Sequence, residues 1–108
     1  MKGKQMTYKN TNKRDVNEPG LIALWRGAGC VVKQMDKDAG FDLLVIAPNG
    51  VHIVEVKNPV YHWKLTEAEQ VTRAEVMALG QAYNVIVRKS EALALIGAVD
   101  DDAEVHGR

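Results

Sequence analysis

The sequence predicts one small α/β domain, in which helices cover both faces of a mixed central sheet. Two runs rich in aliphatic and β-branched residues, 41–47 and 51–57, flank the turn signal Pro48-Asn49-Gly50, a pattern typical of a β-hairpin. Two other stretches, 18–27 and 66–79, carry apolar residues at helical spacing. The predicted order is helix, three strands, helix, strand and helix.

Length and composition bound the class of protein. At 108 residues, with 46% hydrophobic and 26% charged residues, the chain suits a single globular domain. No apolar run approaches the length of a membrane span, and the N-terminus lacks the apolar core of a signal peptide. The single Cys30 excludes an internal disulfide. We therefore expect a soluble, cytoplasmic protein with no membrane partner.

The charges cancel overall but are distributed unevenly. The 14 basic and 14 acidic residues give no net charge, yet the first fourteen positions hold only basic charges and the last nine hold four acids. We expect a basic flexible arm over 1–14, a folded domain over 15–99 and an acidic disordered tail over 100–108. Solvated, mobile ends explain such segments. The functional alternative is that the arm, through Lys9, Lys13 and Arg14, neutralises nucleic-acid phosphates.

Local signals place the first elements. Asn17 is a favoured N-cap residue and Pro19 is tolerated in the first turn, so a helix is expected from there to about Gly27. The run 30–35 reads as the first strand. The second strand is apolar on both faces, which argues that helices cover both sides of the sheet.

The later elements follow from capping and breaking signals. Asn58-Pro59 ends the third strand. Thr66 and Glu69 match a capping box, and the helix that they open has an apolar stripe. This crossover helix makes the next strand, 83–88, parallel to the third. A last short helix is expected from Ser90. The apolar stripe of the helix that begins after Thr66 consists of Val71, Ala74, Met77 and Ala78.

Three ionisable residues lie at the end of the hairpin away from its turn: Asp42 on the second strand, and Glu55 and Lys57 on the third. Side chains alternate along a strand and opposite residues share a face, so the parity of the loop decides whether they meet. A loop of Asn49-Gly50 sets Asp42 opposite Lys57. A loop of Pro48-Asn49 sets it opposite Glu55. Either even loop places all three on one face, and an odd loop separates Asp42.

This arrangement favours a divalent cation. Two carboxylates on neighbouring strands repel each other, and burial penalises both charges, unless a cation lies between them. Mg²⁺ meets this need, because it takes oxygen ligands and retains several waters. We expect Asp42 and Glu55 to bind it, with the Val56 carbonyl and Glu18 of the first helix as further ligands. The Lys57 ammonium is suited to hold an attacking water, as phosphodiester hydrolysis requires. The alternative is a surface Glu-Lys pair beside an incidental aspartate.

Two segments, Gly40-Phe41-Asp42-Leu43-Leu44-Val45 and Glu55-Val56-Lys57, resemble the motif of the PD-(D/E)xK nuclease superfamily, with Phe41 where the motif usually has proline. Further segments are similar to its VRR-NUC type, a group of small, often phage-encoded nucleases. These are Lys13-Arg14-Asp15-Val16-Asn17-Glu18-Pro19, Glu55-Val56-Lys57-Asn58-Pro59 and Leu65-Thr66-Glu67-Ala68-Glu69-Gln70.

The resemblance implies a restriction-endonuclease-like αβββαβ core and a metal-dependent DNA endonuclease in a bacterial or phage-infected cell. Asp42 and Glu55 would bind Mg²⁺ or Mn²⁺, Lys57 would position the nucleophile, and Glu18 would support metal or water. Gln70 matches a glutamine that lies beside the active site in this type. Relatives act on branched, flapped or junction DNA. Since so small a domain seldom covers such a substrate alone, we expect a homodimer.

Other interpretations stay open at this point. Tyr61, His62, Trp63 and Lys64 form an aromatic and basic patch suited to grip nucleic acid, although Trp63 is equally suited to pack against the following helix. A non-catalytic nucleic-acid-binding or assembly module with a nuclease-like fold is the main alternative to the enzyme. An enzyme of metal-dependent phosphate chemistry on another substrate is the third possibility.

Overall fold

The computed structural model describes residues 15–60 and 62–98, so the predicted arm and the predicted tail lie outside the described residues. The described chain forms an α-β-β-β-α-β-α domain, as predicted, with a short 3₁₀ turn, η1, between the first two strands. Its elements are α2 (Glu18–Gly27), β2 (Val31–Gln34), η1 (Lys37–Ala39), β3 (Leu43–Ala47), β4 (Gly50–Val56), α3 (Glu67–Ala78), β5 (Tyr83–Ile86) and α4 (Lys89–Leu95).

The sheet has the strand order β2-β3-β4-β5, antiparallel up to β4 and parallel between β4 and β5. This confirms the predicted meander and the parallel crossover through α3. In the hairpin Ala47 pairs with Gly50, so the loop is Pro48-Asn49. It is one of the two even loops considered. Extending this register by one residue beyond β3 sets Asp42 opposite Glu55.

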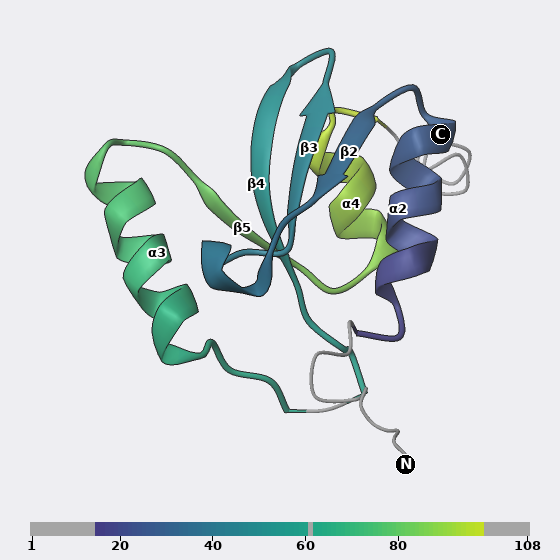
Figure 1. The fold of residues 1–108 in the computed structure, drawn as a ribbon. Coiled ribbons are helices and arrows are strands. Elements are labelled where there is room, and N and C mark those ends of the chain that lie inside the picture. The colour runs from purple at the N-terminus through teal and green to yellow at the C-terminus, as the bar shows by residue number, and fades with distance from the viewer. Residues whose placement is uncertain (1–14, 61, 99–108) are drawn as a thin grey trace, which may run out of the picture.

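The hydrophobic core lies on one face of the sheet, beneath α2 and α4 (Figure 1). Trp25 of α2 is fully buried at 0% exposure, and its indole N–H donates to the Ala92 carbonyl of α4 at 3.1 Å. This bond satisfies the one polar atom that the buried indole carries. The sheet contributes Val32, Leu43, Val45, Val54, Val56 and Ile86 to the core.

Helix α3 lies on the other side of the sheet, apart from α2 and α4 (Figure 1). None of the described residues of α3 is buried, and Val71 and Met77 of the predicted stripe are 52% and 48% exposed. The partly buried residues are instead Glu69, Thr72 and Val76, which share a face at spacings of three and four. The apolar stripe predicted from the sequence therefore faces solvent and does not pack on the sheet.

Contacts with the loop before β3 explain how α3 is turned. Gly40 has φ +82°, and a Cβ at this position would overlap the Thr72 side chain. The Thr72 hydroxyl also lies 3.4 Å from the Ala39 carbonyl, as a long hydrogen bond. Thr72 therefore faces the loop, and Val71 is turned toward solvent.

The start of α2 also differs from its prediction. Asn17 occupies the N-cap position, but its side chain makes no capping hydrogen bond. Its amide donates instead to the carbonyls of Lys57 and Val87, at 3.0 and 2.9 Å. Asn17 thus fastens α2 to the ends of β4 and β5.

Within the described ranges, no helix is long and apolar enough to cross a membrane.

Candidate active site

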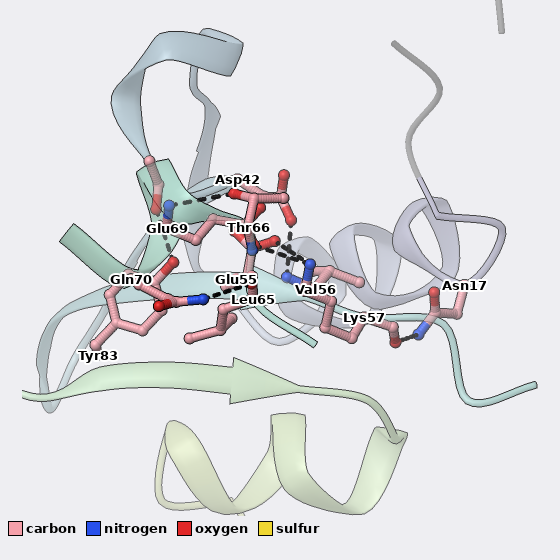
Figure 2. A network of polar contacts seen from close by, with 11 residues as sticks. Asn17, Asp42, Glu55, Val56, Lys57, Leu65, Thr66, Glu69, Gln70 and Tyr83 are labelled. Carbon is pink, nitrogen blue, oxygen red and sulfur yellow. Dashed lines mark hydrogen bonds and ion pairs between the residues drawn. The ribbon is translucent and has the colours of Figure 1, made fainter. Parts of the chain in front are cut away.

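The predicted site forms where β3 begins and β4 ends. Asp42 directly precedes β3, and its backbone N–H donates to the Val54 carbonyl at 3.0 Å. Its carboxylate Oδ2 accepts a hydrogen bond of 2.8 Å from the Val56 backbone N–H (Figure 2). Asp42 is thus anchored to β4 through both its main chain and its side chain. Since N–H and C=O of one strand residue point to the same side, the Val56 carbonyl is directed to the β3 side of β4, like its N–H.

Glu55 and Lys57 lie together on the face that loop parity predicted. Glu55 Oε2 is 3.3 Å from Lys57 Nζ, and Glu55 is only 2% exposed. Glu55 Oε1 is buried without a hydrogen-bond partner among the described residues. A buried carboxylate oxygen in this state is costly in an ordinary fold, so the position indicates a functional group.

Glu69 is the site residue that sequence analysis missed. Its Oε1 is 2.9 Å from Lys57 Nζ and also 2.9 Å from the Thr66 backbone N–H, which donates to it (Figure 2). Thr66 Oγ1 accepts in return from the Glu69 N–H at 3.2 Å, so the predicted capping box is confirmed. The capping motif located Glu69, but only the way α3 is turned shows that the same carboxylate reaches Lys57.

Burial dominates the electrostatics of Glu55. Desolvation, with the nearby carboxylates of Glu69 and Asp42, raises the pKa of Glu55 to about 9, although the Lys57 ammonium opposes this. At neutral pH Glu55 therefore holds a proton when no cation is present. A divalent cation that binds Glu55 must displace this proton.

The two charged neighbours of Glu55, Lys57 and Glu69, have pKa shifts that keep them ionised. Burial alone would lower the pKa of Lys57, but the carboxylates of Glu69 and Glu55 outweigh it and raise this pKa. Burial likewise opposes ionisation of Glu69, yet the Glu55 carboxyl group, the Thr66 N–H and Lys57 lower its pKa. At neutral pH Lys57 is thus a cation and Glu69 an anion. Burial and the charge of Asp42 also raise the pKa of Asp15, which places a further carboxyl group near the site.

The other predicted residues take different places. Glu18 is buried in the first turn of α2, the end that Asn17 fastens to the Lys57 carbonyl. Gln70 is exposed, and its side-chain amide donates to the Leu65 carbonyl at 3.0 Å rather than to Asp42 or Glu55. Lys64 is exposed. Lys9, Lys13 and Arg14 lie outside the described residues.

The donor set fits a hard cation that keeps part of its water shell. Among residues 15–60 and 62–98, no three His, Cys, Asp or Glu side chains form a group that could hold a metal by themselves. The groups present are the carboxylates of Asp42 and Glu55 and the carbonyl of Val56, all oxygen donors. Mg²⁺ and Mn²⁺ accept one or two such carboxylates and complete their shells with water and substrate phosphate. The buried Glu55 Oε1 is the atom that gains a partner by such binding.

In comparisons with known proteins, no family model matches the chain, and no curated protein or solved structure matches it significantly. The resemblance to PD-(D/E)xK nucleases therefore stays a prediction from the motif residues. The geometry of these residues is independent of that resemblance.

Proposed function

We propose that this protein is a divalent-metal-dependent DNA endonuclease of the PD-(D/E)xK type, similar to VRR-NUC nucleases. The observation that carries the proposal is the buried Glu55, with an oxygen that lacks a partner within the described chain, set opposite Asp42 and beside Lys57. A binding module has no evident need to bury this costly combination of groups. Hydrolysis of a phosphodiester uses each of them.

The residues that would hold Mg²⁺ or Mn²⁺ are Asp42, Glu55 and the Val56 carbonyl, with Glu18 as a further carboxylate at the same end of the sheet. A divalent cation held by these residues would lower the pKa of a bound water and offset negative charge on the phosphate. Asp42 contributes a carboxylate that the Val56 N–H holds in place at 2.8 Å. Glu55 contributes the buried carboxylate.

Lys57 supplies the ammonium of the site. Its Nζ is held by Glu69 at 2.9 Å and by Glu55 at 3.3 Å, so the cation is positioned before a substrate arrives. An ammonium has three donors, and these contacts occupy only part of them. The remaining capacity suits a water molecule or a phosphate oxygen, whose negative charge Lys57 stabilises as the bond to the leaving group breaks.

We also propose that two copies pair, as the size of the domain led us to expect. The exposed apolar residues of α3 and the turn after it support this, since Leu79 is exposed along with Val71 and Met77. Sedimentation velocity tests the pairing: a dimer is expected for wild type and a monomer for Val71→Lys/Leu79→Lys. A monomeric wild type at micromolar concentration would refute it.

The activity is tested on a panel of linear, flapped and four-way DNA substrates with Mg²⁺, Mn²⁺ or EDTA. We expect cutting of at least one branched or flapped substrate with either metal and none with EDTA. Lys57→Ala should abolish cutting. Lys33→Ala, which removes an exposed lysine of β2, is the matched control and should cut normally. If wild type and Lys57→Ala behave alike on every substrate, the assignment fails; unchanged DNA binding by both would then favour the non-catalytic module.

A further inference from the structure

A hollow opens at the edge of the sheet next to the proposed active site. It has a volume of about 340 Å³ and is lined by Pro59, His62, Trp63, Val87 and Arg88. These residues come from two segments, the loop that follows β4 and the residues that follow β5. The size is at the lower end of the range for small-molecule sites, which suits one planar ring system but not a duplex.

The lining combines an aromatic surface with cationic character. Trp63 is 41% exposed, whereas Trp25 is fully buried in the core, so the alternative that Trp63 is a core residue is not what the structure shows. Arg88 is exposed, and no ion pair of its guanidinium is found within the described chain. The five lining residues include no acid. An indole face with a nearby guanidinium is suited to a π-system that carries negative charge.

The hollow shares its end of the sheet with the site. Parallel strands end at the same edge, and β4 and β5 are parallel here. Pro59 follows Lys57 by two residues, which is a backbone distance of at most about 7 Å. Asn17 joins the two segments further, because its amide bonds to the carbonyls of both Lys57 and Val87. A strand of nucleic acid that crosses the site therefore reaches the hollow within a few nucleotides.

We propose that the hollow binds an unpaired nucleotide, with its base stacked on Trp63 and its phosphate held by Arg88 and His62. This rests on the proposed function for one point only, that the nucleotide belongs to the strand being cut. The consequence is a preference for DNA that has a single-stranded segment next to the scissile bond. A base in a duplex cannot use the hollow, because its faces are already covered by its neighbours.

The test measures binding of a labelled oligothymidylate to the full chain by fluorescence anisotropy, in EDTA so that nothing is cut. Stacking on one aromatic side chain predicts that Trp63→Leu weakens binding about 5- to 150-fold. Trp63→Phe, which keeps a stacking face, should lose less than Trp63→Leu, and Arg88→Gln should also weaken binding. Val31→Ala removes an apolar side chain of similar exposure on β2, away from the hollow, and should have no effect. Trp63→Leu binding at wild-type strength would overturn the proposal.

Two further arms separate a nucleotide site from simpler explanations. Inorganic phosphate at millimolar concentration should displace the oligonucleotide only weakly; equal displacement by phosphate alone would mean an anion site and would overturn the role of Trp63. Lys33→Ala, which removes an exposed lysine of β2 outside both the site and the hollow, should bind oligothymidylate like wild type. If wild type binds oligothymidylate as expected but cuts no DNA, the nuclease proposal is refuted and the nucleotide site in the hollow stands. If wild type cuts DNA but Trp63→Leu binds as well as wild type, the nucleotide site is refuted and the nuclease proposal stands.

Discussion

The substitution Glu55→Gln gives the sharpest prediction for stability, because it removes one buried titratable group and changes little else in shape. The pKa of Glu55 is about 9 in the folded chain against an ordinary value of 4.5. Between these values the folded chain keeps a proton that the unfolded chain has lost. Wild-type stability without metal therefore falls as pH rises through this window.

The size of the effect follows from proton linkage. One proton of difference lowers the free energy of unfolding by at most about 1.4 kcal/mol per pH unit. From pH 6 to pH 8 the wild type should thus lose up to about 2.7 kcal/mol relative to Glu55→Gln, which has no such proton. Small domains have total stabilities of about 5–15 kcal/mol, so a change of this size is readily measured.

The assay is equilibrium urea unfolding at pH 6, 7, 8 and 9 in EDTA. We expect the difference between Glu55→Gln and wild type to grow with pH in favour of the variant. Glu75→Gln, which changes an exposed carboxylate of α3, is the control and should run parallel to wild type. Parallel pH dependence of Glu55→Gln and wild type would refute the buried, protonated state of Glu55.

The same proteins, prepared without EDTA, test the metal site. Mn²⁺ at about 100 times its dissociation constant should stabilise wild type by about 2.7 kcal/mol. Its affinity should rise from pH 6 to pH 8, because binding displaces the proton on Glu55. Glu55→Gln should gain little stability from Mn²⁺. Equal stabilisation of both proteins would place the metal elsewhere.

Three further predictions concern the supports of the site and the arm. Gly40 and Gly80 have nearly equal φ angles, +82° and +80°, but of these two positions a Cβ would overlap Thr72 at Gly40 alone. In urea unfolding, Gly80→Ala should therefore lower the free energy of unfolding by about 1 kcal/mol, and Gly40→Ala by about 2 kcal/mol more. Equal losses for the two variants would contradict the contact. Glu69→Ala removes charged hydrogen bonds to Lys57 and Thr66 and should lower the free energy of unfolding by about 1.5–3 kcal/mol. Glu69→Gln keeps the capping hydrogen bond and should lose less. A larger loss for Glu69→Gln than for Glu69→Ala would contradict the capping role. Replacing Lys9, Lys13 and Arg14 by glutamine should reduce the slope of log affinity for DNA against log salt by about 2–3, and an unchanged slope would remove the arm from the interface.

Local sequence patterns carried most of the fold. The hairpin signal, the capping box at Thr66 and the helical spacing around Trp25 each depend on neighbours within a few residues, and each prediction is confirmed. The parity argument for Asp42, Glu55 and Lys57 also needed only the loop length. The length of the hairpin loop alone therefore determines that the three residues share one face.

The predictions failed where contacts between residues far apart in the sequence determine how a side chain is placed. The stripe of α3 that includes Val71 was predicted from apolarity, but Thr72 against Gly40 and Glu69 against Lys57 turn the opposite side toward the sheet. Those pairs are 32 and 12 residues apart, beyond any local pattern. Asn17 was predicted to cap its own helix, yet it bonds to carbonyls 40 and 70 residues away.

The central claim is that Asp42, Glu55 and Lys57 hydrolyse DNA with a divalent metal. The most direct measurement is the single-turnover rate of cutting in Mn²⁺, on the best substrate of the panel, for wild type, Asp42→Asn and Lys57→Met. Each variant should cut at least about 100-fold more slowly than wild type while its urea unfolding stays cooperative. Cutting by both variants at the wild-type rate would contradict the claim.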